Sequence, residues 1–360
     1  MKNKEVIFKR FSDILIPFIA ILASLLLAAL VLWLVGYDPV KAFSSLAKGA
    51  FGDSRKIANT LLEATPLIFT GLAVAFAFRC GLFNIGVEGQ LLVASVAAAY
   101  MGFKFTNLPM IIHLPLSILA AMLVGGLWAS IPGVLKAKLG VHEVINTIMM
   151  NYIAYALVAY LGTKVLIEPP GAIPQTPEIL PSSHLVQIRE FFNINSRLNI
   201  GFLLALLAGF LVYYILWRTV LGYEIRAVGL NPHAAEYSGI SVTRNIIMAM
   251  IISGMLAGLA GAERVLGLHF RYIQGFSPGY GFIGIAVALL GRNTPLGVIM
   301  AALLFGALDS GGAYMARVTK IPNEIVGIVQ AVIIFFVASD YAFRKRLELL
   351  NGRKVVKGDV

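Results

Sequence analysis

The dominant pattern in this chain is a succession of long apolar runs separated by short polar segments. A helix needs about 20 apolar residues to cross the hydrocarbon core of a bilayer. Five charge-free runs reach that length, and each is predicted to form a membrane-spanning helix: residues 14–35, 111–135, 144–163, 198–217 and 272–291. The pattern therefore predicts an all-α, polytopic membrane protein.

Shorter apolar segments lie between these runs, at residues 64–78, 89–103, 245–262, 295–308 and 325–339. Each is marginal by itself as a lipid-exposed span, because it falls short of about 20 residues. Together with the five long runs they predict about ten transmembrane helices in one domain covering residues 1–360. An even number of spans returns the C-terminus to the side of the N-terminus.

Charge gives this arrangement a direction in the membrane. Only 13% of the residues are charged and 59% are hydrophobic, and the net charge is +11. Lys and Arg concentrate in the cytoplasmic loops of membrane proteins, so this charge predicts contact with membrane lipid and no nucleic-acid partner. We expect a multi-pass protein of the cell (plasma or inner) membrane. The N-terminal segment 1–13, the loop 218–244 and the tail 341–360 are predicted to be cytoplasmic, and the proline-rich loop 164–197 extracellular.

Glycine and other small residues mark several apolar segments. Gly81 to Gly86 and Gly279 to Gly284 are both glycine-punctuated openings of apolar segments, as in transporters built from inverted repeats. Glycine is common in membrane helices in any case, so both interpretations stay open. In 245–262, small residues recur at helical spacing in two rows, which predicts close helix packing: Ser253, Ala257 and Gly261; Gly254, Gly258 and Ala262.

The loop around residues 222–240 has the signals of a short capped helix. Asn231 is a suitable N-cap, Pro232 fits the first helical position, and Gly239 is suited to the end of the helix. Gly229 is expected to end the preceding turn. A helix of about two turns that projects into the cytoplasm needs a partner to bury it.

This loop resembles the coupling loop of permeases in the branched-chain amino acid, ribose and nucleoside group of ABC importers. The segment from Gly81 to Gln90, with the sequence GLFNIGVEGQ, is similar to the signature of the nucleoside and simple-sugar branch. The likeness extends from about Thr60 to Asp340. It implies three partners: a cytoplasmic ABC ATPase, a second permease that is similar but different and so makes a heterodimer, and an extracellular substrate-binding protein or lipoprotein. No cofactor or metal is expected.

The resemblance also implies which residues couple the spans to the ATPase. In related coupling loops a Glu stands where this chain has His233, so a salt bridge from that position is not expected. The chain has no Gly-x-x-x-x-Gly-Lys-Ser/Thr loop for a nucleotide phosphate, so we expect a transport subunit that is not itself an enzyme. A bulky charge at Ala235 is expected to block docking. The coupling residues implied are Arg226, Gly229, Asn231, Pro232, Ala234, Ala235 and Gly239.

A second group of residues is a candidate for the substrate pathway. Asn84 and Glu88 share one face if the segment is helical, and a carboxylate at membrane depth should face a cavity or a partner. The polar residues of this group are equally suited to a buried polar network between helices. The candidate pathway residues are Phe83, Asn84, Glu88, Gln90, Asn146, Asn151 and Tyr152.

The substrate ranking comes from the resemblance alone. A nucleoside comes first, a ribose-like sugar second and a branched-chain amino acid third. An ion-coupled secondary transporter is the alternative of another class, but it usually needs ionisable groups within its spans. Only Glu88 and Asp309 come near that description in the sequence.

Overall fold

A computed structural model describes residues 22–169, 171, 173–189, 195–322, 324–328, 330–332 and 335. The predicted terminal segments 1–13 and 341–360 lie outside these residues, as do parts of the first and last predicted spans. Within the described residues the regular secondary structure is helical, with two isolated β-bridges, Gln175–Ile273 and Gln187–Asn199. The all-α prediction is therefore confirmed for this part of the chain.

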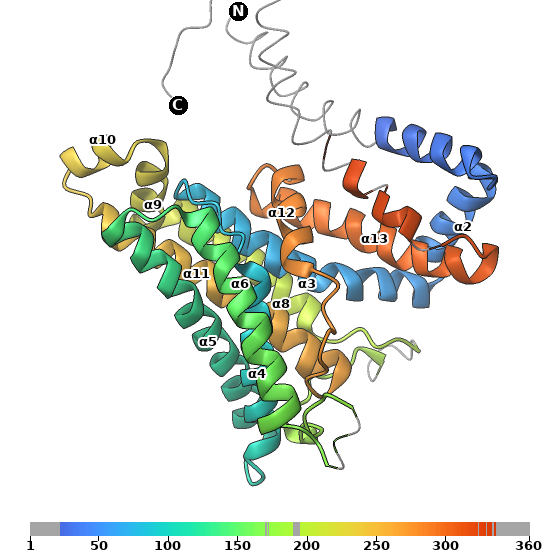
Figure 1. The fold of residues 1–360 in the computed structure, drawn as a ribbon, viewed down its shortest axis with the longest axis horizontal. Coiled ribbons are helices and arrows are strands. Elements are labelled where there is room, and N and C mark those ends of the chain that lie inside the picture. Colours follow the sequence, from blue (N-terminus) through green and yellow to red (C-terminus); the bar gives the residue numbers. More distant parts are fainter. Residues whose placement is uncertain are drawn as a thin grey trace, which may run out of the picture. The chain divides into compact units, whose positions relative to one another are not determined.

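Most helices follow one another with short connections, and the longest connection runs from residue 166 to residue 200 (Figure 1). In chain order they are Leu22–Leu34, α2 (Pro39–Phe51), α3 (Ser54–Arg79), α4 (Val87–Lys104), α5 (Met110–Leu139), α6 (Glu143–Tyr160) with a π-helical turn (Leu161–Val165), a 3-10 turn (Pro181–Ser183), α8 (Gly201–Arg218), α9 (Val220–Leu230), α10 (Pro232–Tyr237), α11 (Val242–Glu263) with a π-helical turn (Arg264–His269), α12 (Tyr280–Leu290) and α13 (Pro295–Thr319).

The chain forms two compact units. One combines Met1–Gly49 with Gly311–Val360, and the other is Ala50–Ser310. In the first unit, Gly49 of α2 comes so close to Gly311 and Tyr314 of α13 that a side chain there would not fit. All the candidate site residues lie in the second unit, which the following paragraphs describe.

Six described helices are long and apolar enough to cross a membrane. The predicted count of about ten is thus not confirmed for the described residues, and the structure does not establish an inverted repeat. α3 is longer than its predicted apolar segment, because the Asp53 carboxylate accepts the backbone N–H of Lys56 (2.9 Å) and caps a polar first turn. That hydrogen bond also lowers the pKa of Asp53. The six spans are Ser54–Arg79, Met110–Leu139, Glu143–Val165, Gly201–Arg218, Val242–His269 and Pro295–Thr319.

α4 is shielded by the rest of its unit. It packs against α5, α6, α11 and α12, and most of its residues are buried. Its first turn contains Glu88 and Gln90, which would be costly to expose to lipid. Neighbouring helices therefore make this helix, with its polar first turn, compatible with a membrane.

The predicted span at 272–291 is wrong as a single helix. Only α12, of 11 residues, is helical there, and at about 1.5 Å per residue it covers about half of a hydrocarbon core. Gly275 and Gly279 both have positive φ (78° and 97°), and Pro278 lies between them. These residues keep the part of the run before Tyr280 in an irregular segment, which is tolerated at membrane depth only where protein or water surrounds it.

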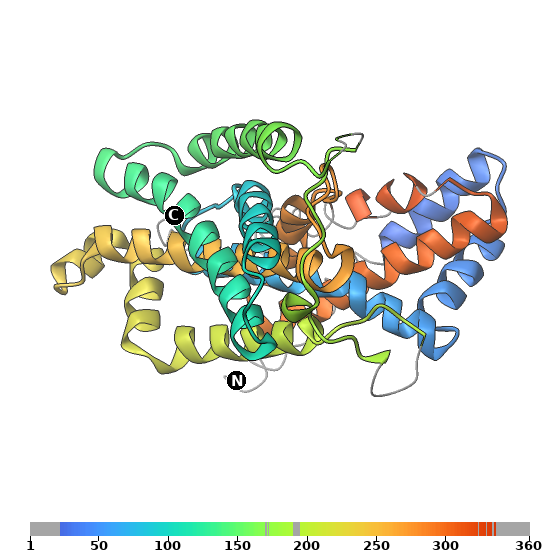
Figure 2. The same ribbon diagram turned by 90° about the horizontal axis from the view of Figure 1, so that it is seen from below.

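The small residues of α11 pack as predicted. A Cβ atom on Gly254 would collide with the backbone of Gly125, and one on Gly258 with that of Ala121, both on α5. On another face, Gly261 approaches Leu91 and Ser95 of α4 with equally little space. Figure 2 shows α11 running through the middle of this unit. Small residues thus bring the backbones of α4, α5 and α11 into direct contact.

Candidate functional site

The predicted signature segment folds into a turn that leads into α4. Gly81 has φ 75°, a left-handed conformation that glycine adopts without strain. Two residues before Gly86, the Asn84 side-chain oxygen accepts the Gly86 backbone N–H (3.0 Å), and α4 begins at Val87. The predicted glycine-punctuated opening of a helix is therefore confirmed here, and the opening at Gly279 is confirmed by the start of α12.

Asn84 and Gln90 form a closed hydrogen-bond network. The Asn84 amide donates to Gln90 Oε1 (3.1 Å) and to Ser253 Oγ (2.9 Å), and Gln90 Nε2 donates back to Asn84 Oδ1 (3.1 Å). Ser253 in turn donates to the Ala73 carbonyl (2.7 Å). All these polar groups are buried, so the network ties α3, α4 and α11 together and leaves little capacity for a ligand.

The other predicted polar residues are also occupied or lie elsewhere. The Asn151 side chain accepts the Gly89 N–H (2.9 Å) and donates to the Ile85 carbonyl (3.0 Å), which attaches α6 to the start of α4. Asn146 makes a long contact with the Pro132 carbonyl (3.4 Å). Tyr152 is 64% exposed. Phe83 lies against Phe78, with ring centroids 5.0 Å apart. Of the seven predicted pathway residues, only Glu88 lines the pocket described next.

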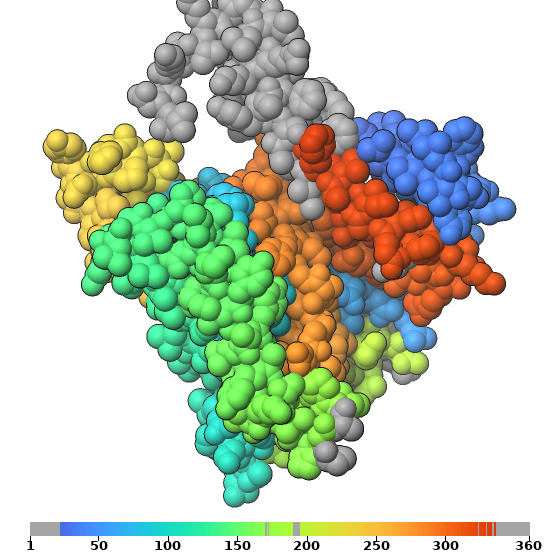
Figure 3. Space-filling model, in the orientation of Figure 1, coloured from blue at the N-terminus to red at the C-terminus, as the bar shows by residue number. Residues whose placement is uncertain are grey.

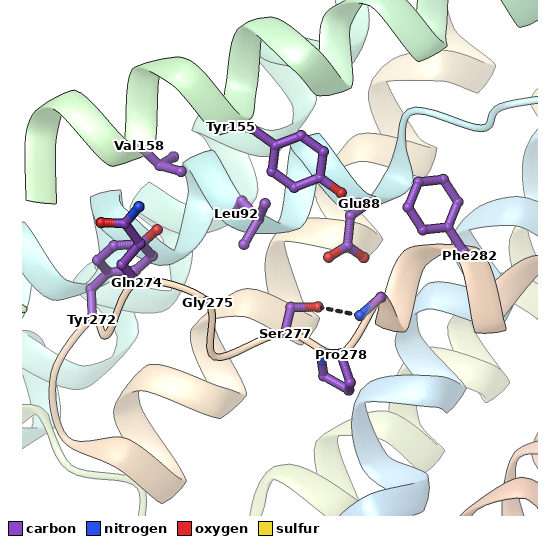
Figure 4. Close-up of a pocket in the computed structure, with 11 residues that line it drawn as sticks. Glu88, Leu92, Tyr155, Val158, Tyr272, Gln274, Gly275, Ser277, Pro278 and Phe282 are labelled. Carbon is purple, nitrogen blue, oxygen red and sulfur yellow. Dashed lines mark hydrogen bonds between the residues drawn. The ribbon is translucent and has the colours of Figure 1, made fainter. Parts of the chain in front are cut away.

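A pocket of about 440 Å³ lies between α4, α6 and the segment that leads into α12. Figure 3 shows α6 and this segment side by side on one face of the molecule. Figure 4 shows the Glu88 carboxylate turned toward Ser277, with the Tyr155 hydroxyl turned toward Glu88. Tyr155 and Phe282 are partly exposed, so the pocket is open on one side. Its lining residues are Glu88, Leu92, Tyr155, Val158, Tyr272, Gln274, Gly275, Ser277, Pro278, Gly279 and Phe282.

The carboxylate of Glu88 is held at the beginning of α12. The backbone N–H of Gly281 donates to Glu88 Oε2 (2.6 Å), and Ser277 Oγ accepts the N–H groups of Gly279 and Tyr280 (3.2 Å each). A side chain on Gly281 would collide with the backbone of Glu88. The two glycine-punctuated openings therefore meet, and the first turns of α4 and α12 are in contact.

Sequence reasoning missed Tyr155, Gln274, Ser277 and Phe282. Tyr155 lies one helical turn after Tyr152, on a span with polar residues on more than one face, so the direction of its side chain could not be assigned from the sequence. The other three lie in or next to the irregular segment that was predicted to be part of a helix. The dipeptide Pro278-Gly279 is a turn signal that could have separated this segment from α12.

A buried charge cluster was also missed. Arg264 is fully buried; its guanidinium contacts Glu63 (3.2 Å) and Glu263 (3.4 Å) and lies over the ring of Tyr280 at 4.9 Å. Asn199 donates to the Glu263 carboxylate (2.9 Å). The predicted segment 245–262 stopped before this charged pair, but α11 continues through Glu263 because the charges are paired. The cluster supports the start of α12 through Tyr280.

The predicted coupling segment forms two helices, α9 and α10. Asn231 caps α10 by accepting the Ala234 N–H (3.0 Å), Pro232 occupies its first position, and Gly239 follows its end with φ 80°. These three predictions are confirmed. Gly229 does not end a turn: it lies inside α9, where its backbone touches Arg79 and Cys80 so closely that a side chain would not fit.

The surface of α10 differs from the expectation at one position. Ala235 is 4% exposed and packs against its own chain, whereas Ala234 is exposed, so a charge at Ala235 would disturb α10 itself. The large exposed side chains here are Tyr237 (95%) and Leu230 (88%).

Arg226 ties this segment to the spans. Its guanidinium lies 6.0 Å from the centre of the Trp217 ring, and Arg79 lies 5.2 Å from the centre of the same ring. Arg79 also donates to the carbonyl of Asn293, at the turn after α12 (3.0 Å). The ends of α3, α8, α9 and α12 therefore meet around Trp217.

Comparison with known proteins shows the family to which the chain belongs. The family described as "Branched-chain amino acid transport system / permease component" matches residues 56–338, most of the chain. The chain belongs to this permease family. It is 48% identical over 340 residues to the guanosine ABC transporter permease protein NupP of Bacillus subtilis, covering 93% of this chain and 96% of that protein. No solved structure matches the chain.

Two further relatives share most of their length with it. The nucleoside ABC transporter permease protein NupB of Lactococcus lactis is 40% identical, covering 90% of each chain. The glucose ABC transporter permease protein TsgB13 of Haloferax volcanii is 33% identical, covering 94% of this chain and 90% of that protein. The chain is thus an integral membrane permease component of an ABC transporter, a transport subunit and not an enzyme. Membership of this family implies an ATPase and a substrate-binding protein as partners.

Proposed function

We propose that this permease carries nucleosides into the cell. The observation that carries the proposal is its identity of 48% and 40%, over at least 90% of the chain, with permeases named for guanosine and for nucleosides. A sugar is the second candidate, because the glucose permease is 33% identical over a similar length. The pocket suits either solute, since it combines a carboxylate and an amide with aromatic rings.

The pocket around Glu88 is proposed to be part of the translocation pathway. It opens to one side past Tyr155 and Phe282, which are 38% and 44% exposed. We expect a second permease, similar but not identical to this chain, to complete the opposite wall. The predicted residues Asn84, Gln90 and Asn151 support this wall through their hydrogen bonds and are not proposed to contact the solute.

α10 is proposed to dock into the ATPase. The N-terminus, the loop 218–244 that contains α10 and the tail 341–360 are proposed to lie on the cytoplasmic side of the cell membrane. The loop 164–197 is proposed to lie outside. Supporting this, Tyr237 is exposed on α10, a short helix capped by Asn231, and Leu230 is exposed at the end of α9. The contact of Gly229 with Arg79 and Cys80 would transmit a movement of α10 to the turn before α4.

Uptake by the complete transporter tests the substrate. The two permeases, the ATPase and the substrate-binding protein are reconstituted in vesicles, and ATP-driven uptake of labelled guanosine, adenosine, ribose, glucose and leucine is compared at equal concentration. We expect uptake of both nucleosides to exceed that of ribose, glucose and leucine by at least about tenfold, a factor that corresponds to a modest difference in binding free energy. Faster uptake of glucose or leucine would refute nucleoside import, and uptake without ATP would indicate a secondary transporter. Full activity with this permease alone would refute the heterodimer.

A further inference from the structure

Glu88 occupies a position that would otherwise attract an anion. It lies in the first turn of α4, and its carboxylate accepts the Gly281 N–H at the beginning of α12 (2.6 Å). The N-terminus of a helix carries partial positive charge and free N–H groups, so it favours phosphates and carboxylates. Here two helix N-termini meet at one pocket, and the protein's own carboxylate fills the place between them.

The rest of the pocket does not offset the charge of Glu88. The other residues that line it are neutral at pH 7, with aromatic, aliphatic, amide, hydroxyl or backbone groups. Arg264, which reaches the start of α12 through Tyr280, is paired with Glu63 and Glu263. That buried cluster supplies one cation against two carboxylates, so it adds no positive charge to the pocket wall.

We infer that Glu88 is a charge-selecting residue, which keeps anionic solutes out of the pocket and leaves it open to neutral ones. The inference rests on the proposed role of the pocket as a pathway. It predicts that the permease itself discriminates between a nucleoside and a nucleoside phosphate, in addition to any choice made by a binding protein. Replacing the carboxylate with an amide would remove the negative charge that offsets both helix N-termini, so the pocket would then favour anions.

Thiol modification tests this charge without involving the binding protein. Phe282→Cys is made in a Cys80→Ala background, and the assembled transporter is treated with positively charged, negatively charged and neutral methanethiosulfonates of similar size. The measured quantity is the rate of modification by the positive reagent divided by the rate with the negative reagent. With Glu88 present, this ratio should be higher at position 282 than at the exposed loop position Asn107→Cys. Adding Glu88→Gln should shift the ratio toward the negative reagent by at least about tenfold, as Coulomb attraction and repulsion at several ångströms predict.

Two control variants separate charge from structure. Glu88→Asp keeps the charge and should keep the ratio, and Glu236→Gln removes the same charge from exposed α10 and should leave it unchanged. Inorganic phosphate should slow modification of the introduced thiol only in the Glu88→Gln protein. Equal ratios with Glu and Gln at position 88, or a native ratio equal to that at position 107, would overturn the charge inference alone. Failure of the neutral reagent to react, with and without ATP, would instead overturn the proposed pathway.

Discussion

Residues of one chemical type have different roles here, and their neighbours decide which. Asn84 and Asn151 are buried and use donors and acceptors on groups of other helices. Asn146 is partly buried and makes one long contact. Glu88, four residues after Asn84 and within α4, lines a pocket instead, whereas Asn84 lies in the turn before the helix. The polar residues that the sequence groups as a pathway are therefore mostly a framework that supports the wall of the pocket.

The Asn84 network gives a prediction at this scale. Asn84→Ala leaves buried groups of Gln90 and Ser253 without their partner, which should cost about 2 kcal/mol of stability. We expect a clearly lower midpoint of thermal unfolding for the purified transporter. Asn146→Ala is the matched control, because it removes the same side chain from a weaker contact. If the two variants unfold at the same temperature, the Asn84 network does not stabilise the protein.

At the scale of helices, the notable feature is the pair of openings that lead into α4 and α12. Both begin with glycines in left-handed conformations, Gly81 and Gly279, and their first turns touch. α12 is too short to span a bilayer, and its far end meets Arg79 and, through it, Trp217. Trp217 also lies next to Arg226 of α9. The helices that form the pocket and the helix that leads into α10 therefore meet around Trp217.

Docking by α10 gives the prediction for this scale. Tyr237 is 95% exposed, so Tyr237→Ala should leave the fold intact while removing a large apolar group from the proposed ATPase contact. ATP hydrolysis stimulated by the binding protein and nucleoside uptake should both fall, by about tenfold or more. The control is Tyr100→Ala, which removes a partly exposed tyrosine near the C-terminal end of α4, away from α10. Wild-type values for both activities in the Tyr237 variant would argue against docking through this surface.

At the scale of the whole permease, the proposed orientation can be checked directly. In a Cys80→Ala background, single cysteines are placed at Ser238, beside α10, and at Asn107, between α4 and α5; both positions are exposed. With an impermeant thiol reagent, we expect labelling at position 107 in intact cells and at position 238 only in inside-out vesicles. The reverse pattern would invert the proposed topology and place α10 beyond the reach of a cytoplasmic ATPase.

The sequence by itself determined the class of this protein and the local course of its best-marked segments. Long charge-free runs must be buried in lipid or protein, and a cap such as Asn231-Pro232 acts through near neighbours in the chain. The rows of small residues in α11 are visible as a helical spacing, although the helices they pack against, α4 and α5, are distant in the sequence. Resemblance to ABC permeases added the function. These signals are local, so they can be read without knowing the fold.

Only the tertiary structure decided which polar groups meet. Glu88 and Gly281 are 193 residues apart, and Arg264 and Glu63 are 201 apart, so no periodicity in the sequence reports either contact. The same holds for Tyr155, which lines the pocket only because the irregular segment before α12 lies next to α6. The length of α12 was also decided in this way, because the loop before it is tolerated only where protein surrounds its backbone.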